Sequence, residues 1–159
     1  MIRRRHRGRR GQALVEFALV APIFFLVVFA LIDFGRYVYY VQILNNGARE
    51  GARYAIVHGW QSTSPSGPAA SGTESPDPSG NNVRTAVRNY LVGVIGQSSA
   101  LTIDVCWKPK NGVGGACSGD NSRGTPVEVT VNYQFRSAIP IVPIPPMTVQ
   151  GASTLVINN

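Results

Sequence analysis

The chain has 159 residues, enough for one domain of ordinary size and one membrane-spanning segment. Its net charge is +7, but six of its 15 basic residues are arginines within the first ten positions. Without residues 1–11 the balance is nine basic against eight acidic residues, or +1, which leaves no basic face for phosphates. We therefore expect no nucleic-acid partner; the alternative, an RNA-binding arm, depends on residues 1–11 alone.

An apolar run at 13–32 follows the basic cluster. Its length matches the ~20 residues that a helix needs to cross a bilayer core of about 30 Å. The run ends in the sequence DFGR at 33–36, which lacks the small residues of a signal-peptide cleavage site, so we expect a retained span. Because Lys and Arg beside a span stay in the cytoplasm, we expect a single-pass protein with a cytoplasmic N-terminus and an extracytoplasmic remainder.

The helical pattern continues past the span and predicts one helix over about 12–58. Its apolar and small residues recur at three- and four-residue spacing: Phe34, Val38, Val41, Leu44, Ala48, Ala52 and Ala55. At ~1.5 Å per residue this is a rod of roughly 70 Å, of which about half must lie outside the membrane.

The outer half of this helix is rich in small residues at four-residue spacing. They are Gly47, Ala48, Gly51, Ala52 and Ala55. Such a face allows close approach by another backbone, or it is an ordinary face packed under the chain's own domain. Both interpretations stay open at the level of sequence.

Residues 61–82 are mostly Ser, Pro and Gly with almost nothing to bury, and we expect a flexible loop. Residues 83–95 then show apolar side chains at helical spacing, which predicts a short amphipathic helix. Asn81 or Asn82 is its expected cap, and Gly96 its expected end.

Three stretches alternate apolar and polar residues, at 101–107, 126–135 and, more weakly, 147–157. Alternation means one buried and one wet face, which predicts an antiparallel sheet of about three strands in an α+β head over 83–159. The short helix and the outer half of the long helix are the available covers for its buried face. The connector SAIPIVPIPP at 137–146 is expected to fold over the sheet edge or to present an apolar patch to a partner or the membrane surface.

The two cysteines, Cys106 and Cys117, lie in the exported part, where an oxidising compartment favours a disulfide. A haem site would need C-x-x-C-H, and a zinc site would need more ligands than the histidines His6 and His58 supply. We expect no metal and no cofactor.

Residues that would carry enzyme chemistry form no recognisable motif. There is no phosphate-binding glycine loop, and His58 has no evident acid or nucleophile partner, so it is expected to be a capping or surface residue. Asp104 and Glu128, on the wet faces of strands, are expected to be solvated. We predict that the protein is not an enzyme.

One charged residue, Glu16, lies within the apolar run. The sequence GQALVEF at 11–17 matches the pattern Gly-x-x-x-x-Glu-Phe/Tyr that prepilin peptidases read, and the chain resembles a type IV prepilin. The resemblance implies that a leader, 1–11, is removed between Gly11 and Gln12 on the cytoplasmic side. It also implies that an inner-membrane assembly platform extracts the subunit and packs its helix, with those of other pilin subunits, into a filament.

A narrower resemblance covers about 45 residues from Val15 to Gly59. This segment is similar to TadE-like domains, found in pseudopilins of the tight-adherence (Tad or Flp) pilus system. Besides Glu16 and Pro22, the positions that the resemblance marks as family motif are Asp33, Gly35, Arg36, Arg49, Glu50, Gly51 and Arg53, and Gly47 joins them as a helix-packing position by its spacing. The head is similar only in style, and Gln12 stands where many type IV pilins have phenylalanine. The resemblance implies a pilin-like fold and a minor subunit for assembly, priming or the tip of a pilus.

Physical chemistry gives Glu16 a role that agrees with this resemblance. Cleavage after Gly11 would place an α-amine on Gln12, one helical turn from Glu16 and near those of neighbouring subunits. A carboxylate and an ammonium buried together cost far less than either alone, so Glu16 is expected to set subunit register. Pro22 removes the hydrogen bond to the carbonyl of Ala18 and can kink the span.

Other functions remain open at this level. The chain could be the major subunit of a type IV-like filament, or a single-span, membrane-anchored extracytoplasmic binding or adhesion protein without a filament role. The bulky head disfavours the first, and the absence of a recognisable constellation disfavours a membrane-anchored enzyme.

Overall fold

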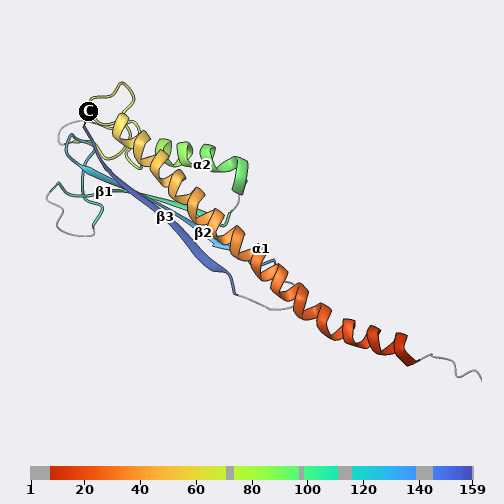
Figure 1. Ribbon diagram of the computed structural model, residues 1–159. Helices are drawn as coiled ribbons and strands as arrows, with labels where there is room; N and C mark the ends of the chain where they lie inside the picture. Colours follow the sequence, from red (N-terminus) through yellow and green to blue (C-terminus); the bar gives the residue numbers. More distant parts are fainter. Residues whose placement is uncertain (1–7, 71–73, 97–98, 111–115, 139–144, 159) are drawn as a thin grey trace, which may run out of the picture.

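The computed structural model describes residues 8–70, 74–96, 99–110, 116–138 and 145–158. In chain order its elements are α1 (Gly8–Val57), α2 (Asn81–Ile95), β1 (Leu101–Trp107), β2 (Pro126–Phe135) and β3 (Met147–Val156). The predicted α+β class is confirmed, with one long helix, one short helix and a three-stranded antiparallel sheet. In Figure 1, α1 is a rod whose N-terminal half projects away from every other labelled element.

Helix α1 has two halves with opposite surroundings. Between Gly11 and Ile32 nearly all side chains are exposed, and the most apolar stretch of the helix has none of its residues buried by the chain. From Leu44 to Ala55 the face toward the head is fully buried. The helix is continuous through Gly11 and Pro22, so neither residue ends it. The apolar N-terminal half is long enough to cross a membrane, as the sequence predicts.

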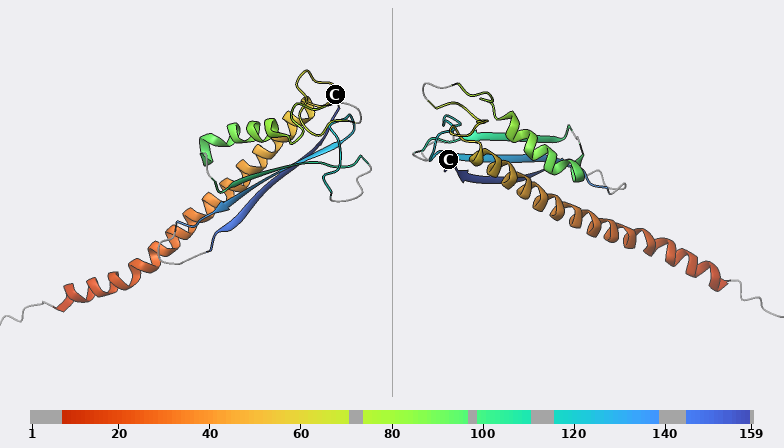
Figure 2. Two further views of the ribbon diagram at one scale, coloured as in Figure 1. Left: turned by 180° about the vertical axis from the view of Figure 1, so that it is seen from behind. Right: turned by 90° about the horizontal axis from the view of Figure 1, so that it is seen from above.

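The sheet has the order β1-β2-β3 with both pairs antiparallel. Alternate residues of β2, Val127, Val129 and Val131, are fully buried beneath the helices, while the residues between them are half-buried on the other face. Figure 2 shows α1 and α2 together on one face of the sheet, which makes a two-layer head. The core between the layers consists chiefly of Leu44, Ala48, Ala52 and Ala55 of α1, Val83, Val87 and Leu91 of α2, and inward residues of the strands.

The small residues of α1 are explained by packing under the chain's own head. A Cβ on Gly47 would lie 3.0 Å from a methyl carbon of Leu91, and one on Gly51 would overlap the side chain of Val87 in α2. On the opposite side, a Cβ on Gly151 of β3 would overlap the backbone of α1 at Leu44. The structure thus decides between the two interpretations: this face is occupied by α2 and the sheet.

The alternation of β3 is confirmed at two of its four expected positions. Val149 and Ile157, the latter just past the strand, are buried in the core, whereas Met147 and Leu155, expected on the same buried face, are 45% and 37% exposed. In the centre of β3, a Cβ on Gly151 would overlap the backbone of α1, so the two elements are in direct contact there.

The expected capping of α2 is wrong. Neither Asn81 nor Asn82 caps the helix; both lie inside it, and their backbone N–H groups donate to the Asp77 carboxylate at 2.7 and 2.9 Å. A carboxylate is a strong acceptor for the unpaired N–H groups of a helix start. Gly96 ends α2 as predicted, with a φ of 67° that favours glycine.

The Ser/Pro/Gly segment 61–82 was expected to bury almost nothing, and its described part differs. Ser66 is fully buried and donates a 2.6 Å hydrogen bond to Asp77, which is itself only 7% exposed. Ser66 N–H also donates to the carbonyl of His58, and Gly67 N–H to that of Asp77. These bonds were not visible in the sequence because each joins a polar residue to a partner that carries no periodic pattern.

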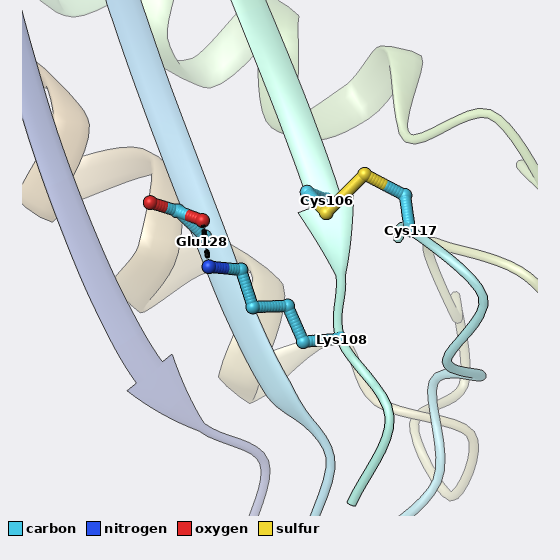
Figure 3. Close-up of a disulfide and its surroundings, with 4 residues drawn as sticks. All are labelled: Cys106, Lys108, Cys117 and Glu128. Atoms are coloured by element: carbon cyan, nitrogen blue, oxygen red, sulfur yellow. Dashed lines mark ion pairs between the residues drawn. A yellow bond between two sulfur atoms is a disulfide. The ribbon is translucent and has the colours of Figure 1, made fainter. Parts of the chain in front are cut away.

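The predicted disulfide is confirmed. Cys106 at the end of β1 is bonded to Cys117, with 4.9 Å between their Cα atoms (Figure 3). The bridge holds the returning chain against the strand, where Gly119 N–H donates to the carbonyl of Trp107. Glu128, expected to be merely solvated, pairs with Lys108 across the β1–β2 ladder, as Figure 3 also shows.

Of the connector at 137–146, residues 139–144 lie outside the described part. Its two expected placements, over the sheet edge or as an apolar patch, therefore stay predictions. Its first two residues are described, and both contact α1.

We predict that Gly51→Ala destabilises the head. Helix propensity favours alanine by ~1 kcal/mol, but overpacking against Val87 costs about 1–3 kcal/mol where the surroundings cannot relax. The measurement is denaturant unfolding of the detergent-solubilised chain, followed by near-UV circular dichroism.

The matched control is Gly35→Ala on the same helix, where a Cβ would meet nothing within 4 Å. It should leave the midpoint of head unfolding unchanged. Equal midpoints for Gly51→Ala and the natural sequence would contradict the packing role assigned to Gly51.

Candidate membrane and assembly interface

The N-terminal part of α1 offers an uncovered apolar surface interrupted by one carboxylate. Leu14, Phe17 and Leu19 are 67–69% exposed, and Glu16 is exposed among them. Within the described residues Glu16 has no hydrogen bond or ion pair. Gly11 and Gln12, the expected processing site, are also exposed, and a Cβ on Gly11 would meet nothing within 4 Å. A carboxylate in such a surface needs a partner that this part of the chain does not supply.

At the upper end of the span, Asp33 ties α1 to the head. It is 8% exposed and accepts hydrogen bonds from the hydroxyl of Ser137 and from the backbone N–H of Ala138, the latter at 3.0 Å. Arg36, one turn along the helix, donates to its other oxygen at 2.8 Å. The first polar residue after the span is therefore where the chain leaving β2 meets the helix.

The same bonds affect the ionisation of Asp33. The hydrogen bond from Ser137 lowers the pKa of Asp33; burial opposes this, and the bonds from Ala138 and Arg36 add to the lowering, so the pKa lies below its usual value. The group is thus a carboxylate at neutral pH, which is the form that can accept all of these bonds at once.

An aromatic cluster lies beside the contact between Asp33 and the head, on its C-terminal side along α1. Phe135, the last residue of β2, packs edge-on against Tyr37 and Tyr40 of α1, with ring centroids 5.9 and 5.7 Å apart. Tyr40 also stacks on Tyr133 at 5.0 Å, and the guanidinium of Arg36 lies 5.3 Å from the centre of the Phe135 ring. Tyrosine side chains of this kind are typical of the layer between a membrane core and water.

The remaining motif positions fall into three groups. Gly47 and Gly51 lie under the head, as described above. Arg49, Glu50 and Arg53 are exposed on the face of α1 that points away from the head, and none of them has a hydrogen bond or ion pair within the described residues. Gly35 is exposed with open space around it. The structure thus brings Asp33 and Arg36 together, whereas Glu16 and the charged outer face stay apart from them.

Comparison with known proteins finds a family match for the N-terminal segment. Residues 11–53 match the family model of TadE-like proteins. This match covers a minority of the chain and begins at the glycine of the expected processing site. No curated protein and no solved structure matches the chain.

The TadE-like segment is consistent with a pilin-like protein associated with a Tad pilus system, and that family is structural and non-enzymatic. A membrane anchor is indicated by its apolar helix. Among the described residues no group of three or more His, Cys, Asp or Glu side chains could hold a metal ion.

Sequence reasoning marked Asp33 and Arg36 through the family resemblance but missed what they bind. Ser137 and Ala138 are more than 100 positions away in the chain. The one signal that could have suggested the contact is the charge of Asp33 at the end of an apolar run, which requires a partner if it is buried.

We predict that Asp33→Asn loosens the tie between α1 and the head. An amide has one acceptor oxygen, so it cannot accept from Arg36, Ser137 and Ala138 together. Hydrogen exchange at the Ala138 amide, measured by mass spectrometry on the detergent-solubilised chain, should become faster.

Glu50→Gln is the control, because it makes the same chemical change at an exposed position of the same helix. It should leave exchange at Ala138 as in the natural chain. Unchanged exchange in Asp33→Asn would show that Asp33 does not hold the connector.

Proposed function

We propose that this protein is a pilin-like subunit, a pseudopilin, of a Tad-type pilus. In this proposal the basic leader stays in the cytoplasm and the apolar half of α1 crosses the inner membrane. A prepilin peptidase cuts between Gly11 and Gln12, and an inner-membrane platform then moves the subunit into an assembly with other pilins. The head beyond α1 is extracytoplasmic, which agrees with its disulfide.

The observation that supports this proposal is the coincidence of the TadE-like match with the uncovered half of α1. The match begins at Gly11 and ends at Arg53, and the apolar residues of its N-terminal half have no cover from the head. An apolar helix of this length needs lipid around it or other helices against it. A pilin-like subunit uses both in turn, first as a membrane anchor and then in a filament.

The outer face of α1 supplies further possible contacts in an assembly. Arg49, Glu50 and Arg53 are exposed and unpaired within the described residues, which suits contacts with charged groups of a neighbouring subunit. A glycine inside a helix costs ~1 kcal/mol relative to alanine, and no packing within the described residues explains Gly35. We propose that a neighbour approaches closely there. The large head favours a minor role, such as priming or the tip, over that of an abundant filament subunit.

Processing is the first test. In cells with an active prepilin peptidase, the membrane-purified protein should begin at Gln12, as measured by N-terminal mass analysis. In cells without the peptidase, the leader should remain. An intact leader in the presence of active peptidase, or a mature form that begins after residue 33, would contradict the proposal.

The second test concerns Glu16. If Glu16 pairs with the new amine of a neighbouring subunit, Glu16→Leu should insert and be cleaved normally but enter pili poorly. Removing one member of a buried ion pair costs ~3–5 kcal/mol. Cleavage is scored by gel shift, and incorporation by co-purification with pili or with another pseudopilin.

Two variants sharpen this test. Glu16→Asp keeps the charge but shortens its reach, so its incorporation should be intermediate. Glu74→Leu removes an exposed carboxylate of the loop before α2, away from the proposed contact face of α1, and controls for the loss of a charge in general. Normal incorporation of Glu16→Leu would refute the pairing and leave recognition by the assembly platform as the role of Glu16.

A further inference from the structure

A shallow cavity of about 460 Å³ lies where the span meets the head. From α1 it is lined by Ala30, Phe34 and Tyr37, and from the sheet by Phe135 and Met147, so most of its wall is apolar. It is open on the surface of the chain. Ala30 belongs to the expected span, whereas Met147 begins β3, so the cavity crosses the level at which the membrane core ends.

The apolar wall of the cavity continues along α1 toward its N-terminus. Ala30, Phe34 and Tyr37 are spaced by four and three residues, so they form one stripe along α1. Extended toward the N-terminus by the same spacing, this stripe contains Val27 and Ile23, which are 59% and 62% exposed. These two residues face lipid if the span is inserted. A lipid chain that lies along them therefore reaches the cavity without crossing a polar side chain of this stripe.

The groups around the cavity suit the interfacial layer of a bilayer. The headgroup and interfacial regions add about 5–7 Å on each side of the hydrocarbon core, which corresponds to roughly three to five helical residues beyond position 32. Asp33, the one carboxylate in the cavity wall, is already bonded to Arg36, Ser137 and Ala138. Arg36 and the exposed hydroxyl-bearing ring of Tyr37 stand at the height of lipid phosphates and glycerol.

We propose that this end of the head is a lipid-binding seat: a phospholipid of the outer leaflet fills the cavity, and the sheet end carrying Phe135 and Met147 rests in the membrane interface. The seat would hold the head at a fixed height and direction over the membrane while the subunit waits there. It depends on the membrane anchor but not on cleavage or filament assembly, so the two ideas can fail separately.

Positions 147 and 155 provide a matched pair for the test. Both lie on the same face of β3 and have similar exposure, 45% and 37%, but they are about 26 Å apart at ~3.3 Å per residue. Met147→Cys and Leu155→Cys are each labelled with an environment-sensitive fluorophore, with the native disulfide left intact. The full-length chain is reconstituted at low density in phosphatidylcholine vesicles with or without a lipid that carries a nitroxide near its headgroup.

The label at 147 should lose most of its fluorescence to the nitroxide lipid and be protected from iodide in the water. The label at 155 should keep most of its fluorescence in the presence of the nitroxide lipid and be quenched by iodide. Equal quenching at both positions by either agent would overturn the proposal. Protection at 147 that rises with protein density, without quenching by the nitroxide lipid, would also overturn it and assign the cavity to a second copy of the chain.

A substitution that introduces a charge tests whether the apolar side chain of Met147 is what keeps this end of β3 in the membrane interface. In a chain labelled at Thr148→Cys, Met147→Glu should reduce quenching by the nitroxide lipid, because a carboxylate leaves the interface for water. Leu155→Glu in the same labelled chain should leave the quenching unchanged. An unchanged signal in Met147→Glu would show that this end of β3 does not rest on lipid.

Discussion

The close approach of α1 to the rest of the head is the contact on which the fold depends. Gly47 and Gly51 of α1 carry no side chain, so residues of α2 can pack directly against the helix backbone there. At Gly151 the backbone of β3 passes directly beside that of α1. With a larger side chain at Gly51 or Gly151, α2 or β3 would have to move away from α1. The consequence is that the C-terminal half of a single helix serves as a core element, and the N-terminal half is left without cover.

This division gives α1 two separate tasks. Apart from Glu16, the N-terminal half is apolar around its whole circumference between residues 13 and 32, which suits lipid or a bundle of similar helices and does not suit water. The C-terminal half buries one narrow face of small residues and exposes charged residues on the other. Since both halves belong to one continuous helix, a force on the anchor passes directly to the head. The proposed transfer of the subunit from the membrane into an assembly would use this continuous connection.

Asp33 marks the boundary between the two halves. It is the first charged residue after the span, and it is bonded to the chain that leaves β2 rather than to solvent. Because Arg36 pairs with it and also lies over Phe135, the boundary joins the helix, the sheet end and the aromatic cluster. The cavity beside it is therefore a fixed feature of the junction, which is why a lipid seat at this height is physically reasonable.

The sequence by itself determined the long helix, the short helix, the three strands, the buried faces of β1 and β2, and the disulfide. Each of these leaves a local signal: a period of about 3.6 or 2 residues, an uninterrupted apolar run, or a pair of cysteines in an exported segment. The resemblance of the N-terminal segment to TadE-like domains was likewise readable from adjacent residues, such as DFGR at 33–36 and AREGARY at 48–54.

Tertiary structure alone decided what occupies the small-residue face of α1, which residue caps α2, and what Asp33 binds. Small residues at four-residue spacing are compatible with any close neighbour, and only the position of Val87 and Leu91 shows that the neighbour is α2. Asp77 replaces Asn81 and Asn82 as the cap because the preceding turn brings its carboxylate to the helix start. The contact of Asp33 with Ser137 joins residues more than 100 positions apart, and such a bond leaves no periodic pattern in the chain because only the packing of α1 on the sheet creates it.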